Sequence, residues 1–395
     1  MKTTRRAFMA QAAAAGGVIG LGMGATARPA RAADDLPFGE VQKADRSLKI
    51  LILGGTGFIG PHMVRYARER GHTLTLFNRG RTAPELFPNA DTRIGDRDPD
   101  RDAGLSALEE GEWDAVIDNS GYVPRHVRAS AQMLKDRAKQ YLFVSTISVY
   151  ASTSQPGMDE DAEVGTLEDP TVEQVTGLTY GPLKAYCEKE AMEAFGKRAC
   201  IVRPTLIVGP GDPTGRFTYW PVRVDRGGEV LCPGNPSDPV QYIDARDLAM
   251  FCVHCLEGSI NGKFNACGPL GGMSIAELIY GCGAVTNAVV DYTWADAAFL
   301  AEHEVAPWAQ MPVWVPPDGD YAGFGSVSCK RAFDAGMTYR PFADTARDTL
   351  HWWKGLADDD AMKSRMAGLT PEREKEVLEA WHARSKEAAP AETAG

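Results

Sequence analysis

Short apolar runs alternate with longer amphipathic segments from residue 48 to about residue 203. The runs predict β-strands at Lys49–Leu53, Thr73–Phe77, Thr92–Ile94, Ala115–Asp118, Tyr141–Ser145 and Cys200–Val202. In the segments between them, apolar residues recur every three or four positions, which predicts helices at Pro61–Arg70, Arg125–Lys135 and Leu183–Phe195. Strands that alternate with helices usually form parallel sheets. The pattern therefore predicts an α/β fold with a doubly wound, Rossmann-type parallel sheet.

The pattern changes after residue 208. Pro- and Gly-rich loops follow, for example Gly209–Pro213 and Cys232–Pro236. Such loops suit a smaller substrate-capping region. We therefore expect a main domain at 48–208 and a capping region at 209–368, from which strands or helices return to the main domain. Thr370, Pro371 and Glu372 mark a helix start within a C-terminal helix and tail at 369–395.

The N-terminus has the composition of an export signal. Arg5 and Arg6 precede an uncharged Ala/Gly-rich run, which ends at the small-residue site Ala30-Arg31-Ala32. This order predicts a twin-arginine (Tat) signal peptide at 1–32, cleaved near Ala32-Ala33, followed by a linker at 33–47. Beyond the signal, no stretch reaches the roughly 18 apolar residues of a membrane span. We expect an exported, periplasmic protein with no membrane segment in its mature form.

Net charge and cysteine content limit the classes of ligand that we expect the protein to bind. The chain has 395 residues and a formal net charge of -11, which disfavours binding to a phosphate backbone. We therefore expect a small-molecule substrate and no nucleic acid. Eight cysteines include one close pair, Cys252 and Cys255, in a segment that reads as helix. A single pair of this kind predicts buried thiols and no metal site.

The turn Gly54-Gly55-Thr56-Gly57-Phe58-Ile59-Gly60 directly follows the first predicted strand and leads into a helix. Gly54, Gly57 and Gly60 permit a tight turn and a close approach of the backbone to a pyrophosphate. The free N–H groups at the helix start, near Phe58 and Ile59, favour the same anion. Residues 48–208 are therefore predicted to be a dinucleotide-binding domain.

The end of the second strand indicates which dinucleotide binds. NAD sites usually carry an acidic residue there, but this chain has Asn78, Arg79, Gly80 and Arg81. Guanidinium groups suit the 2′-phosphate of NADP. The pattern favours NADP over NAD. NAD stays open, because Arg79 and Arg81 could equally be solvated loop charges.

Several motifs together resemble the extended short-chain dehydrogenase/reductase family, in its NAD-dependent epimerase/dehydratase group, over residues 48–270. Beside the glycine turn they are Gly95-Asp96, Ser145 to Tyr150, Tyr180-x-x-x-Lys184, Arg203-Pro204 and Gly209-Pro210. The resemblance implies that Asp96, with Arg97 beside it, contacts the adenine. It also implies a tendency to dimerise. Further cofactor contacts are implied for Asn119, Ser120, Gly121 and Ser145.

Tyr180 and Lys184 carry the expected chemistry. Four residues apart on a helix, they lie on one face. A phenol has a pKa of about 10, and a nearby ammonium favours the phenolate. Tyr180 is then the acid/base during hydride transfer, and Lys184 also binds the nicotinamide ribose, as the resemblance implies. Thr146, with Ser145 as the alternative, falls where the family holds the substrate oxygen.

One departure bears on the substrate. Relatives that act on nucleotide sugars carry a phosphate-binding arginine where this chain has Val240. Arg216 or Arg223 could replace it from the preceding loop, although both could be surface charges. Tyr122 and Arg125 are weaker candidates. The expected substrate is carbohydrate-like.

Export limits the reaction. A Tat substrate crosses the membrane folded and can carry a cofactor with it, but no free NADP(H) pool replenishes that cofactor outside. We therefore expect an epimerase/dehydratase-type reaction that restores a tightly held dinucleotide. The alternatives are an NADPH-dependent reductase of a small carbonyl compound and a non-catalytic dinucleotide-binding protein.

Overall fold

The computed structural model describes residues 38–358 and 360–388, so the predicted signal peptide lies outside the described residues. Its centre is a seven-stranded, all-parallel sheet with the order β10-β6-β5-β4-β1-β2-β3. This arrangement confirms the predicted doubly wound sheet and adds a seventh strand to the six expected. The strands are β1 (Lys49–Leu53), β2 (Thr73–Asn78), β3 (Asp91–Ile94), β4 (Trp113–Asp118), β5 (Ala138–Val144), β6 (Ala199–Pro204) and β10 (Gly262–Ala266).

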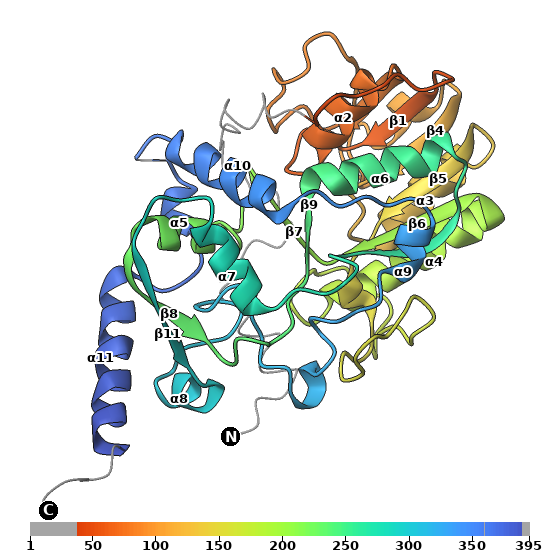
Figure 1. Ribbon diagram of the computed structural model, residues 1–395. Coiled ribbons are helices and arrows are strands. Elements are labelled where there is room, and N and C mark those ends of the chain that lie inside the picture. The colour runs from red at the N-terminus through yellow and green to blue at the C-terminus, as the bar shows by residue number, and fades with distance from the viewer. Residues whose placement is uncertain (1–37, 359, 389–395) are drawn as a thin grey trace, which may run out of the picture.

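Helices cover both faces of the sheet (Figure 1). The alternating direction of the side chains along β1 explains why helices are needed on both faces. Ile50 and Ile52 pack in one core with α2 (Gly60–Glu69) and α6 (Ala245–Glu257). Leu51 and Leu53 pack in another core with α3 (Pro124–Leu134) and α4 (Tyr180–Phe195). Successive side chains on a strand point to opposite faces, so a continuous apolar strand requires helices on both.

The capping region has its own core, in which Trp220 and Trp314 are fully buried. Two pairs of short parallel strands lie here, β7 with β9 and β8 with β11. Its strands and helices are β7 (Leu206–Val208), α5 (Tyr219–Asp225), β8 (Gly228–Pro233), β9 (Tyr242–Asp244), α7 (Ile275–Gly283), β11 (Val290–Ala295), α8 (Ala297–Glu302), α10 (Phe342–Lys354) and α11 (Pro371–Ala388).

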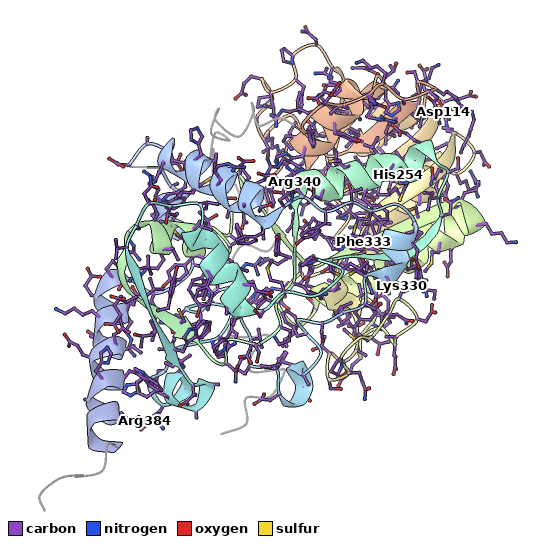
Figure 2. All side chains as sticks on the ribbon, viewed as in Figure 1. Asp114, His254, Lys330, Phe333, Arg340 and Arg384 are labelled. Atoms are coloured by element: carbon purple, nitrogen blue, oxygen red, sulfur yellow. The ribbon has the colours of Figure 1, made fainter. Side chains whose placement is uncertain are left out.

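Not all of residues 209–368 belong to this cap. α6 and β10 return to the main sheet, and α9 (Lys330–Asp334) packs beside β10. Figure 2 shows His254 of α6 and Phe333 of α9 near the sheet, whereas Arg384 lies on α11 at the far end of the cap. Five short 3-10 turns complete the described elements: η2 (Ser106–Leu108), η3 (Ile147–Val149), η4 (Gly196–Arg198), η5 (Gly319–Tyr321) and η6 (Lys363–Arg365).

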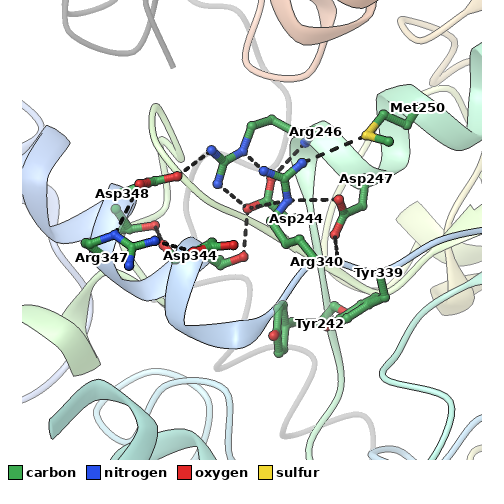
Figure 3. A network of polar contacts seen from close by, with 12 residues as sticks. Tyr242, Asp244, Arg246, Asp247, Met250, Tyr339, Arg340, Asp344, Arg347 and Asp348 are labelled. Atoms are coloured by element: carbon green, nitrogen blue, oxygen red, sulfur yellow. Dashed lines mark hydrogen bonds and ion pairs between the residues drawn. The ribbon is translucent and has the colours of Figure 1, made fainter. Parts of the chain in front are cut away.

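An ionic network joins the cap to the main domain (Figure 3). Arg246 binds Asp244 at 2.8 Å, beside the start of α6, and Asp348 of α10 at 2.5 Å. Arg340 binds Asp247 of α6 at 2.8 Å. Because Asp244, Arg246 and Asp247 are buried and the charges in the network alternate, the network ties α10 to the junction of β9 and α6.

The cysteines are all free, buried thiols, as the single close pair predicted. Within the described residues, no cluster of three or more His, Cys, Asp or Glu side chains could hold a metal ion. No helix in that part of the chain is long and apolar enough to cross a membrane.

Candidate active site

The carboxyl ends of three neighbouring strands bring the site together. Gly54 follows β1, Asn119 follows β4, and Thr146 lies just after β5. Gly54 has a φ of +118°, and a Cβ atom on it would lie 2.1 Å from Oδ1 of Asn119. Only glycine fits there, because both the backbone conformation and the approach of Asn119 exclude a side chain. Such an edge is where open α/β sheets bind ligands.

The rest of the glycine turn fits a dinucleotide. A Cβ on Gly60 would lie 2.6 Å from the carbonyl carbon of Gly55, so this glycine allows the helix to pack on the strand. Around a Cβ on Gly57, by contrast, the described chain places no atom within 4 Å. Phe58 is partly exposed, and Ile59 is the N-cap of α2. The turn thus leaves open space at the helix N-terminus, where a pyrophosphate would be held.

The end of β2 presents the two arginines. Oδ1 of Asn78 accepts a hydrogen bond from the amide of Gly80 at 2.8 Å, which shapes the turn between them. Arg79 is exposed, and no hydrogen bond or ion pair to it is found among the described residues. Arg81 is exposed and reaches Asp102 at 3.3 Å. Both guanidiniums are free to meet a ligand, since an exposed pair of this length is weak.

Arg97 has a different role from the predicted cofactor contact. It binds Asp118 with both terminal nitrogens, at 2.5 and 2.8 Å, and also reaches Ser120 and Ser130. Its guanidinium thus stabilises the carboxyl end of β4, next to the site. Asp96 beside it is buried and accepts a hydrogen bond from the amide of Asp98. The hydroxyl of Ser120 donates to the carbonyl of Leu53, so it too supports the loop.

Tyr180 begins α4 and lies against the segment after β5. Gly181 makes this possible, because a Cβ there would lie 2.1 Å from the carbonyl oxygen of Ser148. The helix start therefore touches η3 directly. Thr146 caps η3: its Oγ1 accepts from the amide of Ser148 at 3.1 Å. The structure thus brings Tyr180 and Thr146 together, as the motif order predicted.

The pKa of Tyr180 is raised above its ordinary value, chiefly by burial and also by neighbouring Tyr122. A hydrogen bond with Thr146 and the charge of Arg216 act in the opposite direction. Tyr180 is therefore a protonated phenol in the free protein, suited to donate a proton. The charge that favours the phenolate comes from Arg216, a contribution that the sequence did not assign.

Lys184 is buried and donates to two backbone carbonyls, Gly121 at 2.8 Å and Val144 at 2.7 Å. Its ammonium also lies 4.1 Å from the centre of the Phe143 ring. An ammonium has three donors, so one remains for a ligand. These contacts hold the cation at the carboxyl ends of β4 and β5, and Gly121 enters the site through its carbonyl.

The pKa of Lys184 predicts a pH dependence. Burial lowers it from 10.5 to about 8, although Cys187, Asp118 and Glu188 oppose the shift. The ammonium is present at lower pH and is lost as the pH rises through about 8. We expect the single-turnover rate of carbonyl reduction to fall across that range. Lys184→Met should be slow and lack this ionisation. A wild-type rate unchanged up to pH 10.5 would contradict the assignment.

Ser145 is not available as the alternative to Thr146. Its hydroxyl donates to Oε1 of Glu188 at 2.5 Å, and its amide to the carbonyl of Val202. Glu188 in turn binds Arg203 with both oxygens, at 2.9 and 2.6 Å. All three side chains are buried, so Ser145 belongs to the support of the site.

Two of the substrate candidates are engaged elsewhere. Arg125 binds Asp98, Asp100 and Glu173, at 2.7 to 2.9 Å, which joins two loops at the rim. Arg223 binds Glu374 of α11 at 2.5 Å. Arg223 also donates to the carbonyls of Gly227 and Glu229. Neither guanidinium is left for a substrate, because its donors already meet carboxylates or backbone carbonyls.

Tyr122 and Arg216 remain at the site. The Tyr122 ring lies 6.3 Å from the Tyr180 ring and 5.2 Å from the Lys184 ammonium. The charge of Arg216 lowers the pKa of Tyr180, and Tyr180 in turn acts on the pKa of Arg216. Gly181, Phe143 and the Glu188–Arg203 pair escaped the sequence analysis. A glycine immediately after the expected catalytic tyrosine, inside a helix, was the one available signal.

Comparison with known proteins identifies the family of the chain. The model of the NAD dependent epimerase/dehydratase family matches residues 50–267. The chloroplast stem-loop binding protein of 41 kDa b of Arabidopsis thaliana is 26% identical over 268 residues, covering 60% of this chain and 67% of that protein. The 2-alkyl-3-oxoalkanoate reductase of Stenotrophomonas maltophilia is 30% identical over 224 residues, covering 52% and 64%.

The solved structure of human epimerase family protein SDR39U1 with NADPH has a TM-score of 0.52 and 20% identity, covering 77% of this chain and 99% of that one. At this identity the likeness shows the fold. The family match, in contrast, spans more than half of the chain and contains the glycine turn and the tyrosine–lysine pair. The chain belongs to the NAD dependent epimerase/dehydratase family.

Proposed function

We propose that this protein transfers hydride between NADP(H) and a secondary alcohol or carbonyl carbon of a carbohydrate-like small molecule. The observation that carries the proposal is the convergence of Tyr180, Lys184 and Thr146 at the carboxyl edge of the sheet, beside the glycine turn. The dinucleotide supplies or accepts the hydride. The chain supplies the proton, the orientation and the electrostatic field.

Each side chain has one task in this proposal. Thr146 holds the substrate oxygen through its hydroxyl, which already lies by Tyr180. Tyr180 donates its proton to that oxygen during reduction and takes it back during oxidation. Lys184 holds its ammonium near Tyr122 and offers its third donor to the bound ligands. The carboxyl ends of β4 and β5 hold these side chains in position.

NADP is the preferred dinucleotide in this proposal. Arg79 and Arg81 stand at the end of β2, where an acidic residue would bind the ribose of NAD. A 2′-phosphate placed there gains charge-assisted hydrogen bonds from planar donors. Their exposure supports the proposal, because neither arginine is held by a buried carboxylate.

We also propose that the protein is exported through the Tat route with its dinucleotide bound. Arg5 and Arg6, followed by the small apolar run, support this. A reaction that oxidises and then reduces within one cycle, as in epimerisation or dehydration, needs no external supply of cofactor. The dinucleotide would then remain with the chain through many turnovers.

Protein purified from the periplasm is expected to carry about one NADP(H) per chain, released only on denaturation. Acid or heat treatment followed by chromatography measures the identity and amount of the dinucleotide. Protein from the cytoplasm, expressed without residues 1–32, is the control and should carry the same amount. Cofactor-free protein that turns over repeatedly with added NADPH would contradict the self-contained cycle.

That outcome would favour a second candidate, an NADPH-dependent reductase or dehydrogenase of a small carbonyl compound. The name of the 2-alkyl-3-oxoalkanoate reductase supports it, as does Val240, a buried apolar residue where nucleotide-sugar enzymes carry an arginine. Both candidates use the same residues for the proton and hydride. They differ in whether the dinucleotide leaves after each turnover.

A further inference from the structure

Arg216 is partly buried and lacks the carboxylate partner that the most buried of the described arginines have. Among the described residues, no carboxylate oxygen lies within 4.0 Å of a guanidinium nitrogen of Arg216, the distance that defines an ion pair. Five other buried or partly buried arginines do bind one: Arg97 with Asp118 at 2.5 Å, Arg203 with Glu188 at 2.6 Å, Arg223 with Glu374 at 2.5 Å, Arg246 with Asp244 at 2.8 Å and Arg340 with Asp247 at 2.8 Å. Because its terminal nitrogens reach solvent and meet no carboxylate among the described residues, Arg216 can bind an external anion.

The guanidinium of Arg216 is nevertheless held in place. Its Nε donates to Oγ1 of Thr214 at 3.2 Å, and its carbon lies 5.0 Å from the centre of the Trp308 ring. The two terminal nitrogens have no hydrogen-bond acceptor among the residues that the structure describes. A planar guanidinium whose Nε is hydrogen-bonded and whose two terminal nitrogens are free is suited to bind a carboxylate.

Trp308 is positioned at a conformational cost. Its φ is +65°, in the left-handed region that bulky residues avoid. Its amide donates to the carbonyls of Met311, at 3.1 Å, and Trp314, at 3.0 Å, and its ring packs at 5.2 Å on Phe324. Strain of this kind persists where the surroundings hold it, often at ligand sites. Here it places an aromatic face beneath Arg216.

The location of Arg216 connects it to the reaction. Its loop follows β7, which continues from β6 at the carboxyl edge that also carries Thr146. Burial lowers the pKa of Arg216, while the charges of Asp212 and Tyr180 oppose this. Asp212 is buried and bonded to Thr214, so it already compensates part of the positive charge. Because the negative charge of Asp212 opposes a second anion, a singly charged carboxylate is less disfavoured here than a doubly charged phosphate.

The geometry points to a carboxylate on the substrate, bound by the outer nitrogens of Arg216 beside the carbon that reacts at Tyr180. The substrate class is then a hydroxy acid or oxo acid, including sugar acids. This inference rests on the proposed hydride transfer and specifies what that site accepts. Trp308 excludes water from one face of the guanidinium, which strengthens its attraction for the anion.

The test compares each acid with its neutral counterpart. Wild-type protein saturated with NADP⁺ is titrated calorimetrically with 3-hydroxybutyrate, acetoacetate and gluconate, and with the methyl ester of each. At least one acid should bind about 10- to 100-fold more tightly than its ester, as for hydrogen bonds to a charged group. Arg216→Met should remove that preference, and Arg216→Lys should restore part of it, since the charge returns without the fork.

Three outcomes overturn the inference. They are equal binding of every acid and its ester to wild-type protein, an unchanged preference in Arg216→Met, and tighter Arg216-dependent binding of glucose 6-phosphate than of any acid. NADP⁺ affinity and thermal unfolding of each variant are measured in parallel. A wild-type protein that binds NADP⁺ but shows no preference for any acid over its ester contradicts this inference alone. Failure of wild-type protein to bind NADP⁺ contradicts the proposed function as well.

Discussion

Replacing Tyr180 with Phe is expected to lower the single-turnover rate of hydride transfer by about 10²- to 10⁴-fold, the usual contribution of a positioned acid or base. The ring stays at the start of α4, so packing against Tyr122 is kept. Only the proton and the hydrogen bond with Thr146 are lost. The affinity for NADP(H) should change less than twofold, because the glycine turn and the β2 arginines lie on other elements.

Stopped-flow measurement of nicotinamide absorbance gives the rate, and fluorescence titration gives the dinucleotide affinity. Tyr186→Phe is the matched control. It removes a hydroxyl from the same helix, where that hydroxyl accepts from the amide of Leu167 at 3.0 Å. The control should keep the wild-type rate. A Tyr180→Phe protein as fast as wild type would eliminate Tyr180 as the acid/base and favour the non-catalytic binder.

Replacing Glu188 with Gln is expected to reduce the free energy of unfolding by about 3–5 kcal/mol, as for removal of one partner from a buried ion pair. Glu188 accepts from Ser145 and holds Arg203, and Arg203 also donates to Tyr150. All of these side chains are buried. Glutamine keeps the size but leaves the Arg203 charge unneutralised in a region with little water.

Urea titrations followed by circular dichroism measure the change, with the transition midpoint compared between variants. The double variant Glu188→Leu with Arg203→Met removes both charges and should recover most of the loss, because neither is then left unpaired. A loss below about 1 kcal/mol for Glu188→Gln would place the pair among ordinary surface interactions. Activity should fall with stability, since this cluster supports the end of β5 that presents Thr146.

Local pattern was enough to predict the main sheet and the dinucleotide turn. The continuous apolar run in β1 is typical of a strand covered on both faces, and both cores meet on it. Gly54 and Gly60 were recognisable because a tight turn before a helix requires glycine whatever the rest of the chain does. The tyrosine–lysine spacing was likewise a property of one helix. β10 was missed, because Gly262–Ala266 is short and mixed in polarity.

The sequence by itself therefore determined the fold class, the glycine turn and the placing of Tyr180 and Lys184 on one helix. Only the tertiary structure decided which charged side chains are free. Arg223 finds its partner 151 residues away and Arg125 finds Glu173 48 residues away, separations that no local pattern reveals. The hydroxyl of Ser145 likewise forms its hydrogen bond with a residue distant in the sequence, Glu188. Arg216 resembled these arginines in sequence and differs because folding brings it no carboxylate within ion-pair distance among the described residues, which leaves its charge for a ligand.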